Sequence, residues 1–198
     1  MSEILFIRHA ETDMAGTFCG HSDPELNARG RLQLVELTRT LRAEDIGAVY
    51  TSDLRRCHAT GIALAEAFNT SCRVRSTLRE INFGQWEGLN WDEISRRDNS
   101  YAERWVEEYP RLPAPHGENF SDFVERILKE VKFLSGESQR LGRGIAIVTH
   151  AGVLRTVLCA LHGSSDEEAW KRTKSHCAIV RHAVIRTLPE LDQVEVTL

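Results

Sequence analysis

Three short apolar runs, each followed at once by basic or imidazole side chains, constrain the fold of this chain more than any other feature. The first run, residues 4–7, reads Ile-Leu-Phe-Ile and is followed by Arg8 and His9. Four apolar residues in a row, bounded by polar ones, indicate a strand that is buried on both faces, as in a parallel sheet. Because a strand interior cannot hold an unpaired guanidinium, Arg8 and His9 are expected just beyond the strand, where open α/β sheets bind ligands.

Two later runs repeat this arrangement. Residues 48–50 lead through Thr-Ser-Asp into a helical pattern that contains Arg55. Residues 145–148 lead to His150, which stands directly before another helical pattern. The carboxyl ends of parallel strands meet at one edge of a sheet, so the side chains that follow these three runs are expected to lie together.

The side chains expected at this edge favour an anion site. They comprise two arginines, Arg8 and Arg55, and two histidines, His9 and His150. A helix that begins at Ala151 and Gly152 would add unpaired backbone amides and a partial positive charge. An isolated Arg-His pair most often just begins a solvated loop, but three strand ends of this kind together predict a site for a dianion, and we interpret it as a phosphoryl group.

Length, composition and charge limit the class of protein, its cellular location and its partners. The chain has 198 residues, of which 41% are hydrophobic and 27% charged, as expected for one globular core or for a core with an insertion. No run approaches the roughly 18 apolar residues of a membrane span, and a first strand at residue 4 leaves no room for a secretory leader. Five widely spaced cysteines favour reduced thiols in a cytoplasm. A net charge of -4 gives no reason to expect nucleic acid as a partner.

Four motifs, taken in order, resemble those of the histidine phosphatase superfamily. Arg-His-x-Glu-Thr alone is a weak pattern, but all four at these separations are specific, and the match runs from about residue 5 to residue 158. The motifs begin at Arg8 (Arg-His-Ala-Glu-Thr), Thr51 (Thr-Ser-Asp-Leu-Arg-Arg), Leu78 (Leu-Arg-Glu-Ile-Asn-Phe-Gly-Gln-Trp-Glu-Gly) and Thr149 (Thr-His-Ala-Gly).

The resemblance implies a fold and a chemistry. The fold is α/β, a three-layer α/β/α sandwich with a mostly parallel central sheet, in a single domain over residues 1–198 with an inserted lid at about residues 84–119. The catalytic residues are His9 as the nucleophile that becomes a phosphohistidine, Glu80 as the proton donor, and His150 beside them. Most aromatic side chains of residues 84–119 are interpreted as packing the lid onto the body. No cofactor or metal is implied.

Other site residues are open to two readings. Gly20 fits a family loop of the form Gly-x-x-Asp-x-x-Leu, and His21 after it either faces the substrate or lies on the surface. Family mutases commonly carry an asparagine where Ala15 stands, so either Thr12 or water is expected to take its role, or the phosphate is held less tightly. Within the second motif Arg55 is assigned to the anion, whereas Arg56 and His58 are interpreted as a solvated helix face.

Apolar periodicity predicts the elements that carry these residues. In the helix over residues 54–68, a core-facing stripe is assigned to Ala59, Ile62, Ala65 and Phe68. The other predicted elements are helices over 27–42, from 119 or 121 to about 134, over 153–162 and a short one capped by Ser165 and Glu168, and strands over 74–78, with Glu80 at its end, 179–188 and 193–196.

The function that these residues favour is a phosphatase acting on a small phosphorylated metabolite. Within the family a compact, tryptophan-bearing lid resembles α-ribazole phosphatase or a broad small-ester phosphatase. A phosphoglycerate mutase would need a larger closing segment, whereas this chain is predicted to end on a strand. A phospho-ligand binding module without turnover is disfavoured because His9, Glu80 and His150 are all present. A metal-dependent hydrolase is weaker still, since no His-x-x-x-His or carboxylate cluster adjoins His9 or His150.

Overall fold

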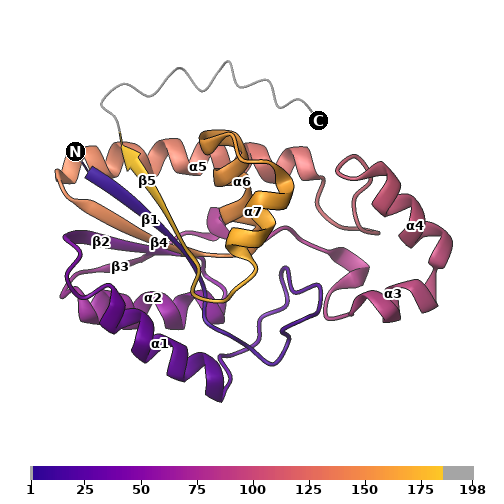
Figure 1. The fold of residues 1–198 in the computed structure, drawn as a ribbon, viewed down its shortest axis with the longest axis horizontal. Coiled ribbons are helices and arrows are strands. Elements are labelled where there is room, and N and C mark those ends of the chain that lie inside the picture. The colour runs from indigo at the N-terminus through magenta and orange to yellow at the C-terminus, as the bar shows by residue number, and fades with distance from the viewer. Residues whose placement is uncertain (1, 185–198) are drawn as a thin grey trace.

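A single five-stranded sheet forms the centre of the molecule in the computed structural model, which describes residues 2–184 (Figure 1). The order across the sheet is β3-β2-β4-β1-β5. Strands β1 to β4 are parallel, and β5 pairs with β1 in the antiparallel sense. The strands are β1 (Ser2–Arg8), β2 (Ile46–Thr51), β3 (Cys72–Val74), β4 (Gly144–Thr149) and β5 (Ile179–Val184).

Side chains alternate between two cores on the two faces of this sheet, as the two-residue period of a strand requires. Ile4 and Phe6 of β1 join one core, and Leu5 and Ile7 join the other. The first core is covered by α5 (Phe120–Leu141), α6 (Ala151–His162) and α7 (Asp166–Thr173), and the second by α1 (Ala28–Thr40) and α2 (Arg55–Ala67). The predicted three-layer α/β/α architecture is therefore confirmed.

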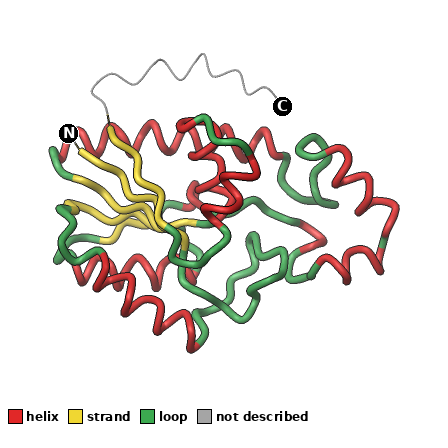
Figure 2. Tube along the Cα trace, in the orientation of Figure 1, coloured by secondary structure: helices red, strands yellow, loops and turns green. Residues whose placement is uncertain are grey.

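A smaller lobe stands beyond the carboxyl ends of the parallel strands. It contains the 3-10 turn η2 (Gly84–Trp86), α3 (Trp91–Arg97) and α4 (Asn99–Glu108), and it has its own apolar cluster around Trp86 and Ile94. Phe18, from the loop after β1, packs edge-on against Trp86 at 5.6 Å between ring centroids. Figure 2 shows the loops that leave the sheet gathered between the strands and this lobe. The aromatic rings thus fasten the lobe to the loop after β1.

Most predicted elements are present, with the bounds shifted by a few residues. Ser165 and Glu168 form the expected capping box at the start of α7. The strand expected over residues 74–78 is wrong, because β3 covers only Cys72–Val74 and Ser76–Leu78 form a 3-10 turn, η1. Helix α6 begins at Ala151, as expected from the turn after His150, and not at residue 153, as expected from the apolar periodicity. The strand expected over 179–188 is present as β5 up to Val184, and residues 185–198, with the second closing strand, lie outside the described residues.

The predicted face of α2 is right only in part, since Ala65 is buried and Phe68 packs against the second core, but the other two members of the stripe are not buried. Ala59 is exposed and Ile62 is 40% exposed, whereas Cys57 and Leu64 are fully buried. The helix is therefore rotated about its axis relative to the predicted stripe, and this rotation decides which arginine of its first turn faces inward. No helix within residues 2–184 combines the length and apolar character needed to cross a bilayer.

Candidate active site

His9 lies at the carboxyl end of β1 and is almost completely buried. Its Nδ1 is 2.7 Å from the backbone carbonyl oxygen of Ala10, which can only accept a hydrogen bond. The proton of the neutral imidazole therefore belongs on Nδ1, and Nε2 carries the free lone pair. The Nε of Arg56 lies 3.3 Å from that Nε2 and points its N–H at it. His9 thus presents Nε2 as the nucleophilic atom, beside a fixed positive charge.

Arg56 is the central cation of the site, although its side chain is fully buried. Its guanidinium donates hydrogen bonds to the carbonyl oxygens of Ser22 at 2.6 Å and Gly20 at 2.7 Å. Another contact joins its NH2 to Nδ1 of His150 at 3.2 Å. These acceptors are neutral, so the positive charge is held in place without being cancelled. The prediction that Arg56 lies on a solvated helix face is wrong.

The structure does not place Arg55 in this group. Its side chain is 58% exposed and forms an ion pair with Glu25, and its backbone N–H donates to Asp23 at 2.6 Å. An arginine in the first turn of a helix opposes the helix dipole, and here the Glu25 carboxylate offsets that charge. Arg56, and not Arg55, is therefore the arginine of this helix that lies beside His9 and His150. The other discounted residue, His58, is exposed as expected.

His150 lies at the end of β4 and is the N-cap residue of α6. Its ring centroid is 5.2 Å from that of His9, and its Nε2 is 3.1 Å from the hydroxyl oxygen of Ser52. Since Arg56 donates to Nδ1, the ring proton belongs on Nε2 and is directed to Ser52. The predicted convergence of the ends of β1, β2 and β4 is thus present.

Glu80 enters the site from the turn after η1 rather than from the end of a strand. The buried carboxylate accepts hydrogen bonds from the backbone N–H groups of Gly152 at 2.9 Å and Ile81 at 3.0 Å. A Cβ atom at Gly152 would lie 2.1 Å from the Glu80 oxygen, so only glycine allows this approach. Ala151 and Gly152 form the first turn of α6, and one of the amides predicted to face a phosphate is held by Glu80 instead.

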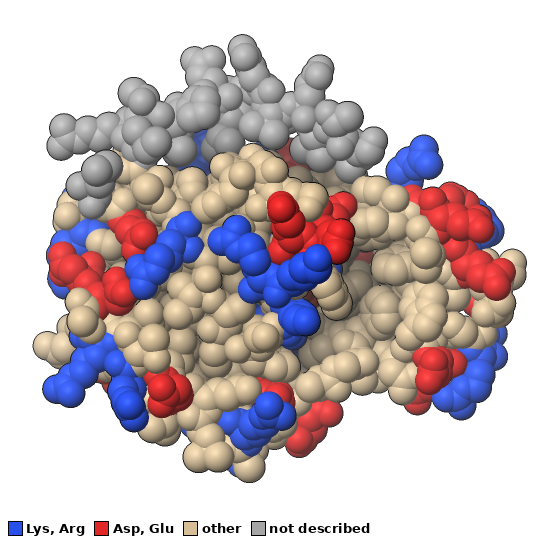
Figure 3. Space-filling model, in the orientation of Figure 1, with Lys and Arg blue, Asp and Glu red and all other residues tan. Residues whose placement is uncertain are grey.

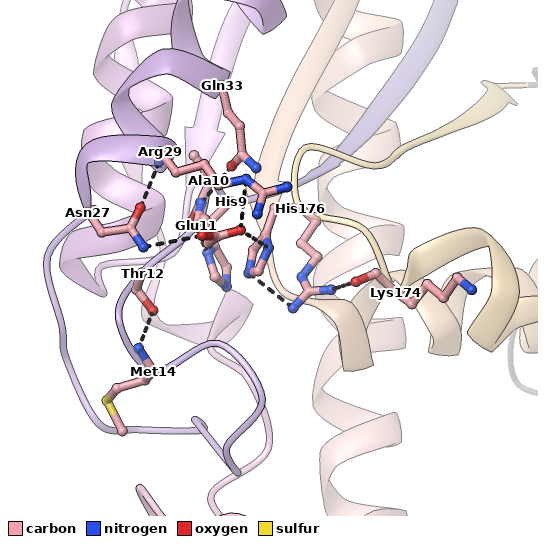
Figure 4. A network of polar contacts seen from close by, with 12 residues as sticks. His9, Ala10, Glu11, Thr12, Met14, Asn27, Arg29, Gln33, Lys174 and His176 are labelled. Carbon is pink, nitrogen blue, oxygen red and sulfur yellow. Dashed lines mark hydrogen bonds and ion pairs between the residues drawn. The ribbon is translucent and has the colours of Figure 1, made fainter.

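Arg8 ends β1 and reaches toward the carboxyl end of α7, where it donates to the carbonyl oxygen of Thr173 at 3.1 Å and to that of Lys174. Its NH2 is 3.4 Å from Nε2 of His176. Figure 4 shows Glu11 next to that histidine, with Nδ1 of His176 3.7 Å from the carboxylate. The Nε of Arg8 is buried and has no partner among the described residues. An unsatisfied guanidinium N–H next to His9 marks a place for an anionic acceptor.

Two residues of this site were not found from the sequence. His176 lies between α7 and β5, outside every motif, and only the tertiary structure brings its ring to 5.6 Å from that of His9. Glu87 accepts backbone hydrogen bonds from Gly20 at 3.1 Å, His21 at 2.8 Å and Ser22 at 2.9 Å. It thereby fixes the loop whose carbonyl groups hold the central arginine, and the motif that contains it was the only signal in the sequence.

The remaining predicted residues lie in the loop after β1. Gly20 packs where a Cβ would come within 2.1 Å of the Ile81 carbonyl oxygen. The imidazole of His21 is directed at the backbone of Glu80, with Nε2 3.1 Å from the carbonyl oxygen, so it is not a free surface side chain. The Thr12 hydroxyl accepts a hydrogen bond from the Met14 N–H at 3.3 Å (Figure 4) and therefore serves its own loop.

Burial and positive charge determine the protonation of the imidazoles. Burial, and then the Arg56 guanidinium, lower the pKa of His9 well below its ordinary value of 6.5, and the same two causes lower the pKa of His150. Burial and the nearby Arg8 lower the pKa of His176 to about 4. All three rings are therefore neutral near pH 7, and the positive charge of the site resides on the guanidinium groups.

Comparison with known proteins agrees with this geometry. The model of the family described as the histidine phosphatase superfamily (branch 1) matches residues 4–197. Phosphoserine phosphatase 1 of Hydrogenobacter thermophilus is 29% identical over 86% of this chain and 81% of its own length. The adenosylcobalamin/α-ribazole phosphatase of Escherichia coli is 28% identical over 84% of this chain and 82% of its own. The structure of a mycobacterial glucosyl-3-phosphoglycerate phosphatase in complex with VO3 has a TM-score of 0.78, with 25% identity over 91% of this chain and 90% of that one.

Proposed function

The chain belongs to the histidine phosphatase superfamily, and we propose that it hydrolyses a small phosphomonoester through a phosphohistidine on His9. The observation that carries this proposal is the lone pair of His9 Nε2, which faces a buried guanidinium beside a second imidazole and a buried carboxylate. A nucleophile, fixed positive charge and a proton-bearing group are what phosphoryl transfer requires. Relatives named as phosphoserine and α-ribazole phosphatases support a small ester as the substrate.

In the first half-reaction Nε2 of His9 gives up the hydrogen bond from Arg56, its lone pair attacks phosphorus, and the bond between phosphorus and the ester oxygen breaks. The Nδ1 proton stays on the ring and is held by the Ala10 carbonyl, which stabilises the positive charge that the phosphorylated imidazole acquires. Arg56 and Arg8 offset the charge of the three phosphoryl oxygens, and the neutral His150 ring can donate its Nε2 proton in a hydrogen bond to one of them. The planar fork of arginine suits this task, because it can donate two hydrogen bonds to one phosphoryl group.

Glu80 serves both half-reactions in this mechanism. As a carboxylic acid it gives its proton to the departing alkoxide, and as a carboxylate it takes a proton from the water that attacks the phosphohistidine. The products are the alcohol, inorganic phosphate and free His9, with Glu80 protonated again. The backbone N–H groups of Ile81 and Gly152 keep the carboxyl group in position throughout.

The lobe beyond the sheet has a place in this proposal. Residues 84–119 form the lid of a single domain over residues 1–198, and the aromatic contacts of Phe18 join that lid to the loop that carries Gly20. Closure of the loop and the lid together would exclude water from the site. The five unpaired cysteines support a cytoplasmic location.

Release of inorganic phosphate tests the proposed reaction. The purified protein should hydrolyse p-nitrophenyl phosphate and small alkyl phosphates, and EDTA should leave the rate unchanged, because no three metal-binding side chains cluster within residues 2–184. Loss of activity in EDTA that added metal restores would favour a metallohydrolase. Faster isomerisation of 3-phosphoglycerate than release of its phosphate would favour the mutase. Binding of phosphate without any turnover would favour a binding module.

Substituting Glu80 should slow the hydrolysis of an ester more when its leaving group must be protonated. Because Glu80→Gln removes the general acid, the first turnover of an alkyl ester should slow by about 10²- to 10³-fold. The first turnover of p-nitrophenyl phosphate, whose leaving group needs no proton, should slow by less than about tenfold. A burst of p-nitrophenolate followed by slow turnover is the expected signature in rapid-quench kinetics. Equal slowing of both esters would mean that Glu80 only maintains the structure, and exposed Glu66→Gln is the matched control.

A further inference from the structure

Arg155 is a further cation near the proposed phosphoryl site, and the mechanism above does not use it. It lies one turn into α6, and its Nε is 3.4 Å from the carbonyl oxygen of Ala151. Side chains on a helix lean toward its N-terminus, and this contact shows that Arg155 does so. Its guanidinium carbon lies 4.9 Å from the centre of the Trp170 ring. An indole on one side and a carbonyl on the other therefore orient the guanidinium toward the end of the helix that carries His150.

The charge of Arg155 has no ion-pair partner in the part of the chain that the structure describes. Arg79 and Arg126, which also border the turn that carries Glu80, each pair with a carboxylate at 2.9 Å or less. Arg155 instead acts on Arg8, since its charge is among the causes that lower the pKa of Arg8, after burial. The two guanidinium groups are thus close enough to repel each other, and an anion bound near both would offset that repulsion.

Polar and aromatic groups of two other segments lie near Arg155. Tyr109, the residue directly after the lobe helix α4, is 44% exposed, and its hydroxyl has no hydrogen-bond partner among the described residues. The charge of Arg155 acts on this phenol as well. Trp170 of α7, whose ring lies under the Arg155 guanidinium, is 53% exposed. Figure 3 shows the surface hollowed between the sheet body and the lobe, with basic side chains at the rim of the hollow.

We propose that Arg155 binds a carboxylate of the substrate, and that the preferred substrates are therefore small phosphomonoesters with a carboxylate a few bonds from the ester oxygen. This inference rests on the proposed function. One helical turn, about 5 Å, separates Arg155 from the amides next to His150, and a carboxylate three bonds beyond the ester oxygen can span that distance. The Tyr109 hydroxyl is placed to donate a further hydrogen bond to the same group.

Two esters that differ only in the carboxylate test this inference. O-Phospho-L-serine and O-phosphoethanolamine share the phosphate, the ester oxygen and the amine, so the ratio of their kcat/KM values isolates the contribution of the carboxylate. The wild-type protein should favour phosphoserine by about 10- to 100-fold, which corresponds to one charge-assisted pair. Arg155→Met, which retains the apolar stem of the side chain, should reduce that ratio to about one, chiefly through a higher KM for phosphoserine.

The controls separate this proposal from the function on which it rests. Arg155→Met should leave phosphoethanolamine and p-nitrophenyl phosphate within about twofold of wild type, and Arg172→Met on the exposed face of α7 should change none of the three rates. A wild-type ratio near one, or equal losses on all three esters in Arg155→Met, would overturn the role of Arg155 and leave the phosphatase intact. Failure of the wild-type protein to release phosphate from any of them would overturn both.

Discussion

Replacing His9 with alanine should lower the rate of phosphate release by about 10⁴-fold or more, because the variant lacks the nucleophile that forms the covalent intermediate. The buried side chain makes one hydrogen bond to the Ala10 carbonyl and accepts one from Arg56, so the variant loses few packing contacts and should remain folded. Rapid quenching of the wild-type protein with a ³²P-labelled ester should trap an acid-labile, base-stable phosphoprotein that is absent from the variant. His58→Ala, an exposed histidine on α2, should retain full activity.

The same prediction fixes the pH dependence. His9 reacts as the neutral ring, and its pKa is lowered well below 6.5 by burial and by Arg56. The acid limb of kcat/KM should therefore lie below pH 6.5, since only at more acidic pH does a proton occupy Nε2 and remove the nucleophile. A limb centred above pH 7 would contradict the assignment, as would undiminished turnover in His9→Ala.

The parts of this site that could be predicted from the sequence are those that local pattern determines. A run of apolar residues ending in a basic or imidazole side chain defines both a buried strand and the residue at its end, so His9 and His150 could be placed side by side without coordinates. Helix α6 begins at Ala151 for a similarly local reason, because residues 151–152 follow the strand directly. Glu80 was named through its motif, although the strand expected before it is a 3-10 turn.

The remaining residues depend on contacts that local pattern does not encode. His176 and Glu87 reach the site through loops whose paths are set by tertiary packing, and each makes its contact with residues more than sixty positions away in the chain. The error at α2 is different, because a signal was available. Successive residues on a helix differ by about 100°, so the choice between Arg55 and Arg56 is a choice of helical phase, and a stripe that includes the exposed Ala59 and Ile62 favours the wrong phase.

The correct stripe would have resolved that choice. Thr60 and Leu64 are fully buried, and Arg56 precedes them by four and eight residues, which places it on the same face. Arg55 precedes the exposed Ala59 by four residues and so faces solvent. The second motif therefore supplies two adjacent arginines of equal charge and very different surroundings, and substituting each of them in turn gives a matched pair of variants on one helix.

Arg56→Lys should lower kcat/KM by about 10²- to 10³-fold, whereas Arg55→Lys should leave it within about twofold of wild type. Lysine keeps the charge of Arg56 but cannot donate to Ser22, Gly20 and His9 at once, so the cation would no longer be fixed against the reacting phosphoryl group. Thermal unfolding should accompany the kinetics, because Arg56→Lys also leaves buried carbonyl groups without donors and should destabilise the fold by about 1–3 kcal/mol. Rates are therefore compared at a temperature where both variants remain folded. A greater loss of kcat/KM in Arg55→Lys than in Arg56→Lys would mean that Arg55 binds the phosphoryl group, and it would contradict the site described above.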